Sequence, residues 1–507
     1  MWRISGVDES PPSDLAGRIW ARDPSAWAPG EDDPANRLGW LDLPFSMASE
    51  TDRLKAAAER VRSDGVKDLV LLGMGGSSLA PEVFSNTFGS APGHPRLTVL
   101  DSTHPLQIAS VAKSLDLERS LFLVSSKSGG TIETMSLYRF FRARIDDGSH
   151  FMAITDPGTS LAELAKREGF ADTWLNPPDI GGRYSALSFF GLVPAVLIGA
   201  DVDKLLEMAR EAAAVCGAEI PAEDNPGLDI GAALSRLAKG GRDKVTFLVG
   251  KEIASFGEWV EQLIAESTGK KGTGVVPVVG EPLVSADRYG VDRVFVQLKL
   301  DEDDFSDDLM ADLEKAGHPT ISFTVPDRSA IGELMFVWEF AVAVAGSMLD
   351  INAFDQPNVE AAKRATREVL ESKGDISWDD EDPTELFADA VEGDLAVLAA
   401  FAPRSTETQA VVDAAREKLV DRGLATMSGF GPRYLHSTGQ LQKGGSPHVR
   451  ALVILDDPMT DEEIPGAEYG FARLIRAQAA GDAQALADAG RPVARTSWRT
   501  FSEWARS

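Results

Sequence analysis

Residues 66–78 read VKDLVLLGMGGSS, and this stretch decides the fold class of the chain. Val66 to Leu72 is a short, mostly apolar run of the kind that forms a buried strand, and a glycine-rich turn follows it directly. A helix is predicted from Pro81. The same order of strand, loop and helix recurs, with further strands predicted at 96–100, 121–124, 151–154 and 171–175. This alternation indicates βαβ units and a parallel sheet flanked by helices.

A second alternation of the same kind follows in the middle of the chain. Strands are predicted at 244–249, 293–300 and 320–325, and long helices at 331–349 and from 357 to about 372. Residues 186–216 look mostly helical and would connect the two halves. We therefore expect two tandem α/β domains, 45–200 and 201–372, after an irregular N-terminal strap, 1–44, that includes a short helix near 15–20.

The remainder, residues 373–507, is predicted to be a C-terminal α/β segment. It begins in an acidic, polar stretch and continues with two helical patterns. A strand at 449–455, a helix around 470–487 and a strand at 492–496 complete the prediction. Between the helical patterns and the first of these strands lies GFGPRYLHSTGQLQKGG, a segment rich in glycine and polar residues.

Composition narrows the classes of function. The 507 residues carry a formal net charge of −29, which disfavours binding to nucleic acid or to an anionic membrane. Cys216 is the single cysteine, so no internal disulfide can form and a reducing, cytoplasmic location is expected. The N-terminus lacks the pattern of a signal peptide, and no apolar run, such as 189–198, approaches the roughly 20 residues of a membrane span.

The glycine-rich loop Gly73–Ser78 could bind an anion. Glycines let the backbone approach a ligand, and the N-terminus of the following helix offers free N–H groups. The loop lacks the third glycine of the dinucleotide fingerprint and the Gly-Lys-Ser/Thr ending of a nucleotide-binding P-loop. A simple tight turn between strand and helix explains it equally well.

The loop Ser125–Thr131, SSKSGGT, carries a stronger signal. It follows a predicted strand, at the end of a parallel sheet where ligands bind. Four hydroxyl groups, one ammonium group and two glycines lie within seven residues. Hydroxyl and backbone N–H groups suit a phosphate monoester, and Lys127 adds positive charge. We favour phosphate binding over a plain polar surface loop.

Four further segments carry candidate site residues, each with a plain structural alternative. Arg183 lies in GGRYS and could stabilise an oxyanion, or only form an ion pair. Glu266 lies in the last turn of a helix in EQLIAESTGK, where a carboxylate opposes the helix dipole and could act as a base. Gln356 and Lys363 lie in FDQPNVEAAK, around the start of a helix. His436, in HSTGQ, could transfer protons near neutral pH, but so could His104.

Taken together, the segments GMGGSS, DSTH, SSKSGGTIET, GGRYS, EQLIAESTGK, FDQPNVE and HSTGQ resemble phosphoglucose isomerase over roughly residues 40–450. The family folds as two sugar-isomerase (SIS) domains, usually in a homodimer. Here HSTGQ follows FDQPN, whereas the corresponding segment precedes it in familiar members. The late HSTGQ resembles a subgroup that is fused behind a transaldolase barrel, so a functional relation to transaldolase is expected, although residues 1–44 leave no room for that barrel.

The resemblance implies a role for each matching residue. The substrate phosphate would be held by Ser126, Lys127, Ser128, Thr131 and Gln356. Gly76 and Ser77 would line the sugar site. Glu266 would be the base, and Arg183 would stabilise the enediolate. Lys363 and His436 would assist ring opening. The family needs no metal and no organic cofactor, and this sequence offers no cluster of metal ligands.

The resemblance therefore implies an aldose–ketose isomerase of glucose 6-phosphate and fructose 6-phosphate, acting through a cis-enediol. Two alternatives stay open. A non-catalytic sugar-phosphate sensor would keep the SSKSGGT loop but would not need ESTGK, GGRYS and a histidine, all of which are present. An isomerase of another hexose phosphate, such as an aminosugar or mannose phosphate, would need a different pocket around C2.

Overall fold

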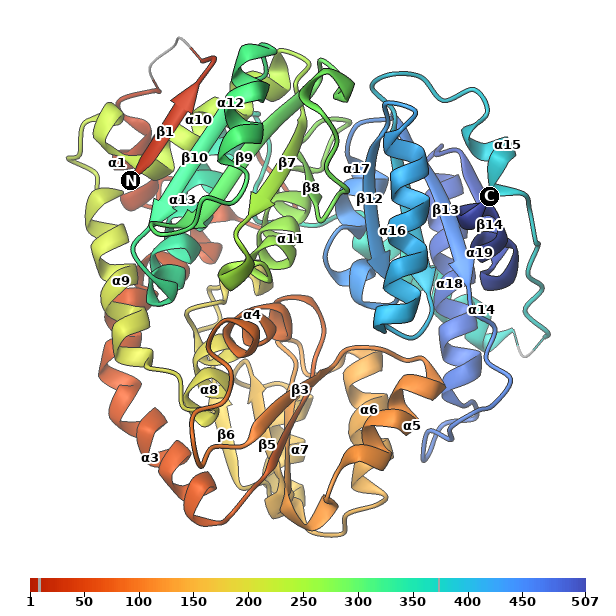
Figure 1. Cartoon of the computed structure of the whole chain (residues 1–507). Helices are drawn as coiled ribbons and strands as arrows, with labels where there is room; N and C mark the ends of the chain where they lie inside the picture. Colours follow the sequence, from red (N-terminus) through yellow and green to blue (C-terminus); the bar gives the residue numbers. More distant parts are fainter. Residues whose placement is uncertain (8–10, 373) are drawn as a thin grey trace.

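The computed structural model describes residues 1–7, 11–372 and 374–507. These residues form three β-sheets, each covered by helices (Figure 1). The first sheet has the strand order β3-β2-β4-β5-β6 and is parallel throughout. Its strands are β2 (Asp68–Leu72), β3 (Arg96–Leu100), β4 (Ser120–Ser125), β5 (Phe151–Thr155) and β6 (Asp172–Leu175). All five lie where the alternating pattern predicts them.

The second sheet has the order β1-β10-β9-β7-β8. Strands β7 (Lys244–Val249), β9 (Arg293–Leu300) and β10 (Thr320–Val325) were predicted, whereas β8 (Val276–Val279) was missed. Pro277 lies inside β8, and proline within a short run argues against a strand. The N-terminal strap is not wholly irregular, because β1 (Trp2–Ser5) pairs antiparallel with β10.

The third sheet, β12-β11-β13-β14, is also parallel. It contains β11 (Leu395–Phe401), β12 (Ala425–Phe430), β13 (Val449–Leu455) and β14 (Val493–Ser497). The prediction of two helical patterns before HSTGQ was therefore wrong in part, because β11 and β12 enclose a helix. The C-terminal segment thus has a sheet and one apolar cluster of its own, and it shares a second cluster with α11 and β8.

The helices lie around these sheets (Figure 1). Around the first sheet and in the strap they are α1 (Leu15–Trp20), α2 (Leu43–Ser46), α3 (Thr51–Ser63), α4 (Leu79–Phe88), α5 (Pro105–Ser114), α6 (Ile132–Arg142), α7 (Ser160–Glu168) and α8 (Phe189–Leu197). Those of the middle part are α9 (Val202–Val215), α10 (Pro226–Lys239), α11 (Phe256–Thr268), α12 (Asp307–Lys315), α13 (Ile331–Met348) and α14 (Val359–Glu371). The C-terminal part adds α15 (Pro383–Phe387), α16 (Thr406–Val420), α17 (Gly439–Gly444), α18 (Phe471–Asp488) and α19 (Trp498–Arg506).

Helix α13 is the central helix of the molecule. By length and composition the segment Arg328–Met348 could cross a membrane, but 83% of its apolar window is buried inside the protein. The helix packs against α9, α10 and α11, and Trp27 of the strap donates a hydrogen bond of 2.8 Å to the Ala343 carbonyl. We therefore describe α13 as a core helix, which fixes the strap and α11 in place.

Candidate active site

The GMGGSS loop lies against two other motifs. Gly75 has φ of +54°, and a Cβ atom placed on it would lie 2.4 Å from the carbonyl oxygen of His436. A Cβ atom on Gly76 would lie 2.0 Å from the Gly182 carbonyl oxygen. Glycine is therefore required at both positions for close approach. This packing brings the loops GMGGSS, GGRYS and HSTGQ together, although they come from distant parts of the chain.

Glu266 and Arg183 lie side by side in the buried centre of this cluster. Their side chains are 7% and 3% exposed, and Arg183 Nη1 lies 3.5 Å from Glu266 Oε2. Arg183 Nε also donates to Ser267 Oγ at 2.8 Å. Burial raises the pKa of Glu266, whereas the charges of Arg183, His436 and Lys270 act to lower it. A carboxylate with a raised pKa beside a fixed cation is suited to accept a proton from carbon.

The same guanidinium reaches the FDQPN segment. Arg183 Nη2 donates to the carbonyl oxygens of Ala353 at 2.6 Å and Asp355 at 3.1 Å. Gln356, the next residue, is exposed at the end of this loop. The structure therefore joins GGRYS, ESTGK and FDQ around one arginine, and it places Gln356 at the margin of the buried cluster.

His436 also reaches the cluster, despite its late place in the sequence. Its Nε2 lies 3.1 Å from Oε1 of Glu133, which is 4% exposed and belongs to α6, directly after the SSKSGGT loop. Although burial favours the neutral acid, the charge and hydrogen bond of His436 lower the pKa of Glu133. The chain thus returns to the site through HSTGQ, so the changed motif order does not separate His436 from the other motifs.

His104 occupies a different position. Its Nδ1 accepts a hydrogen bond of 3.3 Å from the Leu106 N–H and so caps α5, while Nε2 lies 3.2 Å from the Asp456 carbonyl oxygen. Both ring nitrogens are therefore used in fixing local structure. This geometry favours His436 over His104 as the histidine of the site.

The SSKSGGT loop lies between β4 and α6, next to the GMGGSS loop. Ser125 Oγ donates to the Ser77 carbonyl oxygen at 3.2 Å, and the hydroxyls of Ser126 and Thr131 lie 2.9 Å apart. Ser128 is exposed, and its Oγ accepts from the Gly130 N–H at 3.4 Å. Lys127 forms an ion pair with Asp156 and donates to the Pro178 carbonyl at 3.3 Å. An incoming phosphate would therefore have to compete with Asp156 for this ammonium group.

Gln440 of HSTGQ connects two further motifs. Its Nε2 donates to the Gly269 carbonyl at 2.9 Å and to Asn358 Oδ1 at 2.8 Å, and its Oε1 accepts from the Asn358 N–H at 2.9 Å. Lys363 lies further out on α14, where its 46% exposed side chain pairs with Glu360 at 2.7 Å. Of the predicted catalytic residues, Glu266, Arg183 and His436 are brought together, and Lys363 lies at the surface of α14, where its charge acts to lower the pKa of Glu133, the buried partner of His436.

Four polar residues of the site were not predicted. Gln262 Nε2 donates to the His436 carbonyl at 2.7 Å, and Gln478 Nε2 donates to Glu133 Oε1 at 2.7 Å. Lys270 is buried beside Glu266. Gln262 and Lys270 belong to EQLIAESTGK, and Glu133 to SSKSGGTIET, so the quoted motifs offered a signal for these three. Gln478 lies on α18 outside every motif and carries no such signal.

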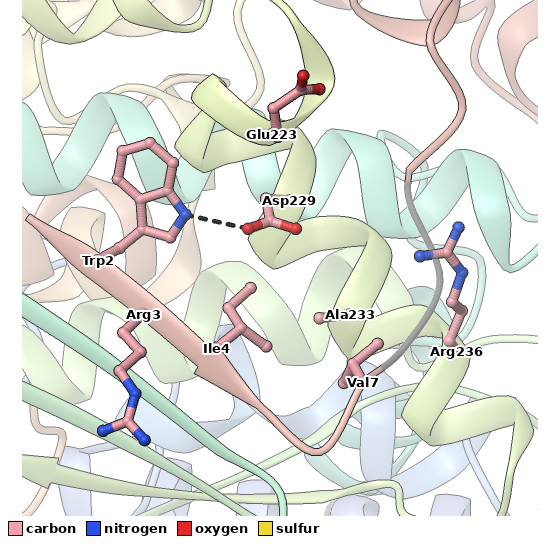
Figure 2. A pocket seen from close by; sticks show the side chains of 8 residues that line it. All are labelled: Trp2, Arg3, Ile4, Val7, Glu223, Asp229, Ala233 and Arg236. Carbon is pink, nitrogen blue, oxygen red and sulfur yellow. Dashed lines mark hydrogen bonds between the residues drawn. The ribbon is translucent and has the colours of Figure 1, made fainter.

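Two hollows lie near the sheets. One, of about 440 Å³, is lined by residues of β1 and α10, including Trp2, whose Nε1 donates to Asp229 Oδ2 at 3.0 Å (Figure 2). It shares no lining residue with the motif cluster. The other, of about 180 Å³, lies beside the cluster and is lined by residues of all three sheet regions, among them Leu79, Glu261 and Ser437. Among the described residues, no three of His, Cys, Asp and Glu group together as metal ligands.

The sequence matches known proteins in this region. Residues 46–276 match the family model of phosphoglucose isomerase. A glucose-6-phosphate isomerase of Thermus thermophilus is 30% identical over 391 residues, which cover 67% of this chain and 91% of that protein. The chain belongs to the phosphoglucose isomerase family. A second relative, the glucose-6-phosphate isomerase of Carboxydothermus hydrogenoformans, is 28% identical over 66% of this chain and 86% of its own length.

Two solved structures share the fold of this chain. A hypothetical protein from Thermus thermophilus superposes with a TM-score of 0.60 at 28% identity, covering 71% of this chain and 94% of that one. A glucose-6-phosphate isomerase from Chlamydia trachomatis gives a TM-score of 0.53 at 20% identity, over 74% and 82% of the two chains, and so supports the fold. The resemblance read from the motifs is thus confirmed at the level of the phosphoglucose isomerase family.

Proposed function

We propose that the protein is a glucose-6-phosphate isomerase, which interconverts glucose 6-phosphate and fructose 6-phosphate. The observation that carries this proposal is the meeting of Glu266, Arg183 and His436 in one buried cluster of a chain that belongs to the phosphoglucose isomerase family. A base, a fixed cation and a histidine are the groups that proton transfer beside a carbonyl requires.

In the proposed reaction His436 opens the sugar ring, with Lys363 assisting from α14. Glu266 then removes the proton from C2 of the open-chain aldose and returns it to C1, while a proton moves from the C2 hydroxyl to the C1 oxygen. Arg183 stabilises the negative charge of the enediolate between these steps. The hydroxyl groups and Lys127 of the SSKSGGT loop, Gln356, and the backbone at Gly76 and Ser77 hold the phosphate and the sugar.

A coupled assay tests this proposal. Purified protein receives fructose 6-phosphate, and glucose 6-phosphate is followed through the reduction of NADP⁺ by its dehydrogenase. Glu266→Gln should lower kcat by about 10³-fold or more, since it removes the base and leaves the shape of the site. A parallel run in D₂O should place deuterium at C2 of the glucose 6-phosphate formed. Unimpaired turnover in the Gln variant would contradict the role of Glu266.

A binding measurement with fructose 6-phosphate and a panel of other hexose phosphates, run beside this assay, separate the alternatives. A sugar-phosphate sensor would bind fructose 6-phosphate without turnover, and an isomerase of another hexose phosphate would prefer mannose 6-phosphate or glucosamine 6-phosphate as substrate. The presence of the base and the arginine beside the phosphate loop favours the glucose 6-phosphate isomerase over the sensor.

Three broader features belong to the proposal. A homodimer is supported by the family resemblance, and size-exclusion chromatography with light scattering would test it. A cytoplasmic location is supported by the single cysteine, which rules out an internal disulfide. A functional relation to transaldolase is supported by the late position of HSTGQ, and a test for sedoheptulose 7-phosphate formation from glucose 6-phosphate and erythrose 4-phosphate, in a mixture with a transaldolase, would examine it.

A further inference from the structure

The loop of residues 352–356, between α13 and α14, determines where Arg183 lies. Two carbonyl groups of this loop, those of Ala353 and Asp355, accept hydrogen bonds from Arg183 Nη2 at 2.6 and 3.1 Å. The remaining bonds of the guanidinium run to Ser267 and Glu266 on α11. A shift of this loop would therefore move the arginine away from the developing charge.

A second buried cation holds the same loop from the same side. Lys270 is 3% exposed, and its Nζ donates to the Asn352 carbonyl at 2.5 Å and lies 2.9 Å from Asp355 Oδ1. The N-terminal strap closes the loop from outside. There Glu31 N–H donates to Asp355 Oδ2 at 3.2 Å, and a Cβ atom on Gly30 would lie 2.0 Å from the same oxygen. The loop is thus fixed between a buried ammonium group and a backbone that tolerates no side chain.

The four buried charges of this region balance. Arg183 pairs with Glu266, and Lys270 pairs with Asp355, so each basic group faces an acidic one. Charges can be buried at acceptable cost only when they are paired, and removing one member leaves another without a partner. Glu266 has to change its charge in the proposed reaction, so the remaining members determine how readily it does so.

We propose that Lys270 is a positioning residue of the isomerase site, which fixes the 352–356 loop beneath Arg183 and whose charge stabilises the carboxylate form of Glu266. This role rests on the proposed function and extends it to a residue that does not touch the substrate. Lys270 follows Glu266 by four residues, so one short segment, ESTGK, supplies both the base and the cation that supports it.

The electrostatics of the neighbours agree with this arrangement. Burial raises the pKa of Glu266, and Arg183 from the GGRYS turn, His436 from the HSTGQ turn and Lys270 oppose that rise. Burial and the charge of Arg183 lower the pKa of Lys270 to about 7, while Asp355 and Glu266 act in the opposite direction. Lys270 is therefore mostly charged below about pH 7.

The test compares Lys270→Gln with Lys271→Gln, because Lys271 is the adjacent lysine and is exposed. For Lys270→Gln we expect kcat with fructose 6-phosphate to fall by about tenfold to a hundredfold, because Arg183 loses its fixed support. We also expect the acidic limb of kcat/KM against pH to move up by about one unit, because Glu266 loses a nearby cation. Lys271→Gln should leave kcat within about twofold of the wild type and should not move the acidic limb of kcat/KM.

A double variant, Lys270→Gln with Asp355→Asn, covers the case in which the single variant does not fold. It removes both members of the ion pair and leaves no unpaired buried charge. The acidic limb should still move upward, because Lys270 opposes the raised pKa of Glu266 and Asp355 is not among its main determinants. A folded variant with the acidic limb and kcat of the wild type would overturn the role of Lys270 alone, whereas an inactive wild-type protein would overturn the proposed function with it.

Discussion

His436 Nε2 lies 3.1 Å from Glu133 Oε1, although 303 positions separate the two residues in the sequence. Glu133 follows the phosphate loop of the first sheet, and His436 follows β12 of the third. His436, the histidine of the candidate site, therefore comes from the C-terminal region. This region, with its own four-stranded sheet, thus contributes to the candidate site.

A residue of α18 also forms a hydrogen bond with Glu133, the partner of His436. Gln478 is 1% exposed, donates to Glu133 at 2.7 Å and accepts from Thr103 Oγ1 at 2.6 Å. Gln478→Leu should lower kcat by about tenfold, because Glu133 loses one of the two donors on its Oε1 and His436 loses a fixed partner. Exchange between the anomers of glucose 6-phosphate, followed by NMR saturation transfer, should slow in parallel, because His436 is the residue that we propose to open the ring.

A matched control for this prediction is available on the same helix. Gln484 is exposed and donates to Asp488 at 2.7 Å, so Gln484→Leu should change neither rate by more than about twofold. Normal anomer exchange in a folded Gln478→Leu protein would mean that Gln478 only stabilises the fold.

Sequence patterns predicted the first sheet well and the third sheet incompletely. The strands of the first sheet are followed by loops with clear turn residues, and each is short and apolar. Strand β11, LAVLAAF, is rich in alanine and leucine, which also favour a helix, so the pattern could not distinguish the two. The pairing of β11 with β12 and β13 decides its conformation, and pairing between distant segments is not visible in one short stretch.

The residues of the candidate site could likewise be predicted from the sequence only in part. Residues inside compact motifs, such as Glu266, Arg183 and His436, could be predicted because each motif combines glycines with a charged or polar group. The side chains that hold these residues in place could not be predicted in this way. Gln478 lies in a long amphipathic helix and gains its role only when α18 packs beside α6. Lys363 stays a prediction, because it pairs with Glu360 on its own helix while its charge also acts on Glu133.

Glu266 and His436 lie in one cluster of the same chain, which leads to a complementation experiment. Glu266→Gln and His436→Asn subunits should be co-expressed with two different tags and purified in tandem, so that only mixed oligomers remain. We expect no recovery of activity, because Glu266 and His436 serve the same site within one chain. Recovery to about a quarter of the wild-type activity or more would mean that subunits exchange the C-terminal region. Mixed oligomers of wild-type and Glu266→Gln chains, which should keep about half the activity, are the control.

Arg433 connects the three sheet regions next to His436. Its guanidinium forms ion pairs with Asp101 after β3, Glu82 on α4 and Glu258 on α11, the last at 2.6 Å. Arg433→Met would leave Asp101 and Glu82 buried with less compensation, and we expect it to lower the free energy of unfolding by about 3 kcal/mol or more. Urea denaturation measures this change. Arg476→Met, which removes an exposed pair with Asp457, should change the stability by less than about 1 kcal/mol.

Glu261 gives a prediction for the dependence of stability on pH. It lines the 180 Å³ hollow, and burial together with the charge of Glu258 raises its pKa to about 8, against the opposing charges of Arg416 and Arg433. An acid whose pKa is raised on folding stabilises the protein while it is protonated, and this contribution is lost as the pH rises from about 4.5 through about 8.

Glu261→Gln keeps a neutral side chain at every pH. Its free energy of unfolding should therefore match that of the wild type near pH 4 and exceed it by about 1 to 3 kcal/mol at pH 8.5, a value reduced from the full shift because the side chain is only half-buried. Urea denaturation at both pH values measures the difference, with the exposed Glu252→Gln as control. An equal difference at both pH values would exclude titration of Glu261 as the cause.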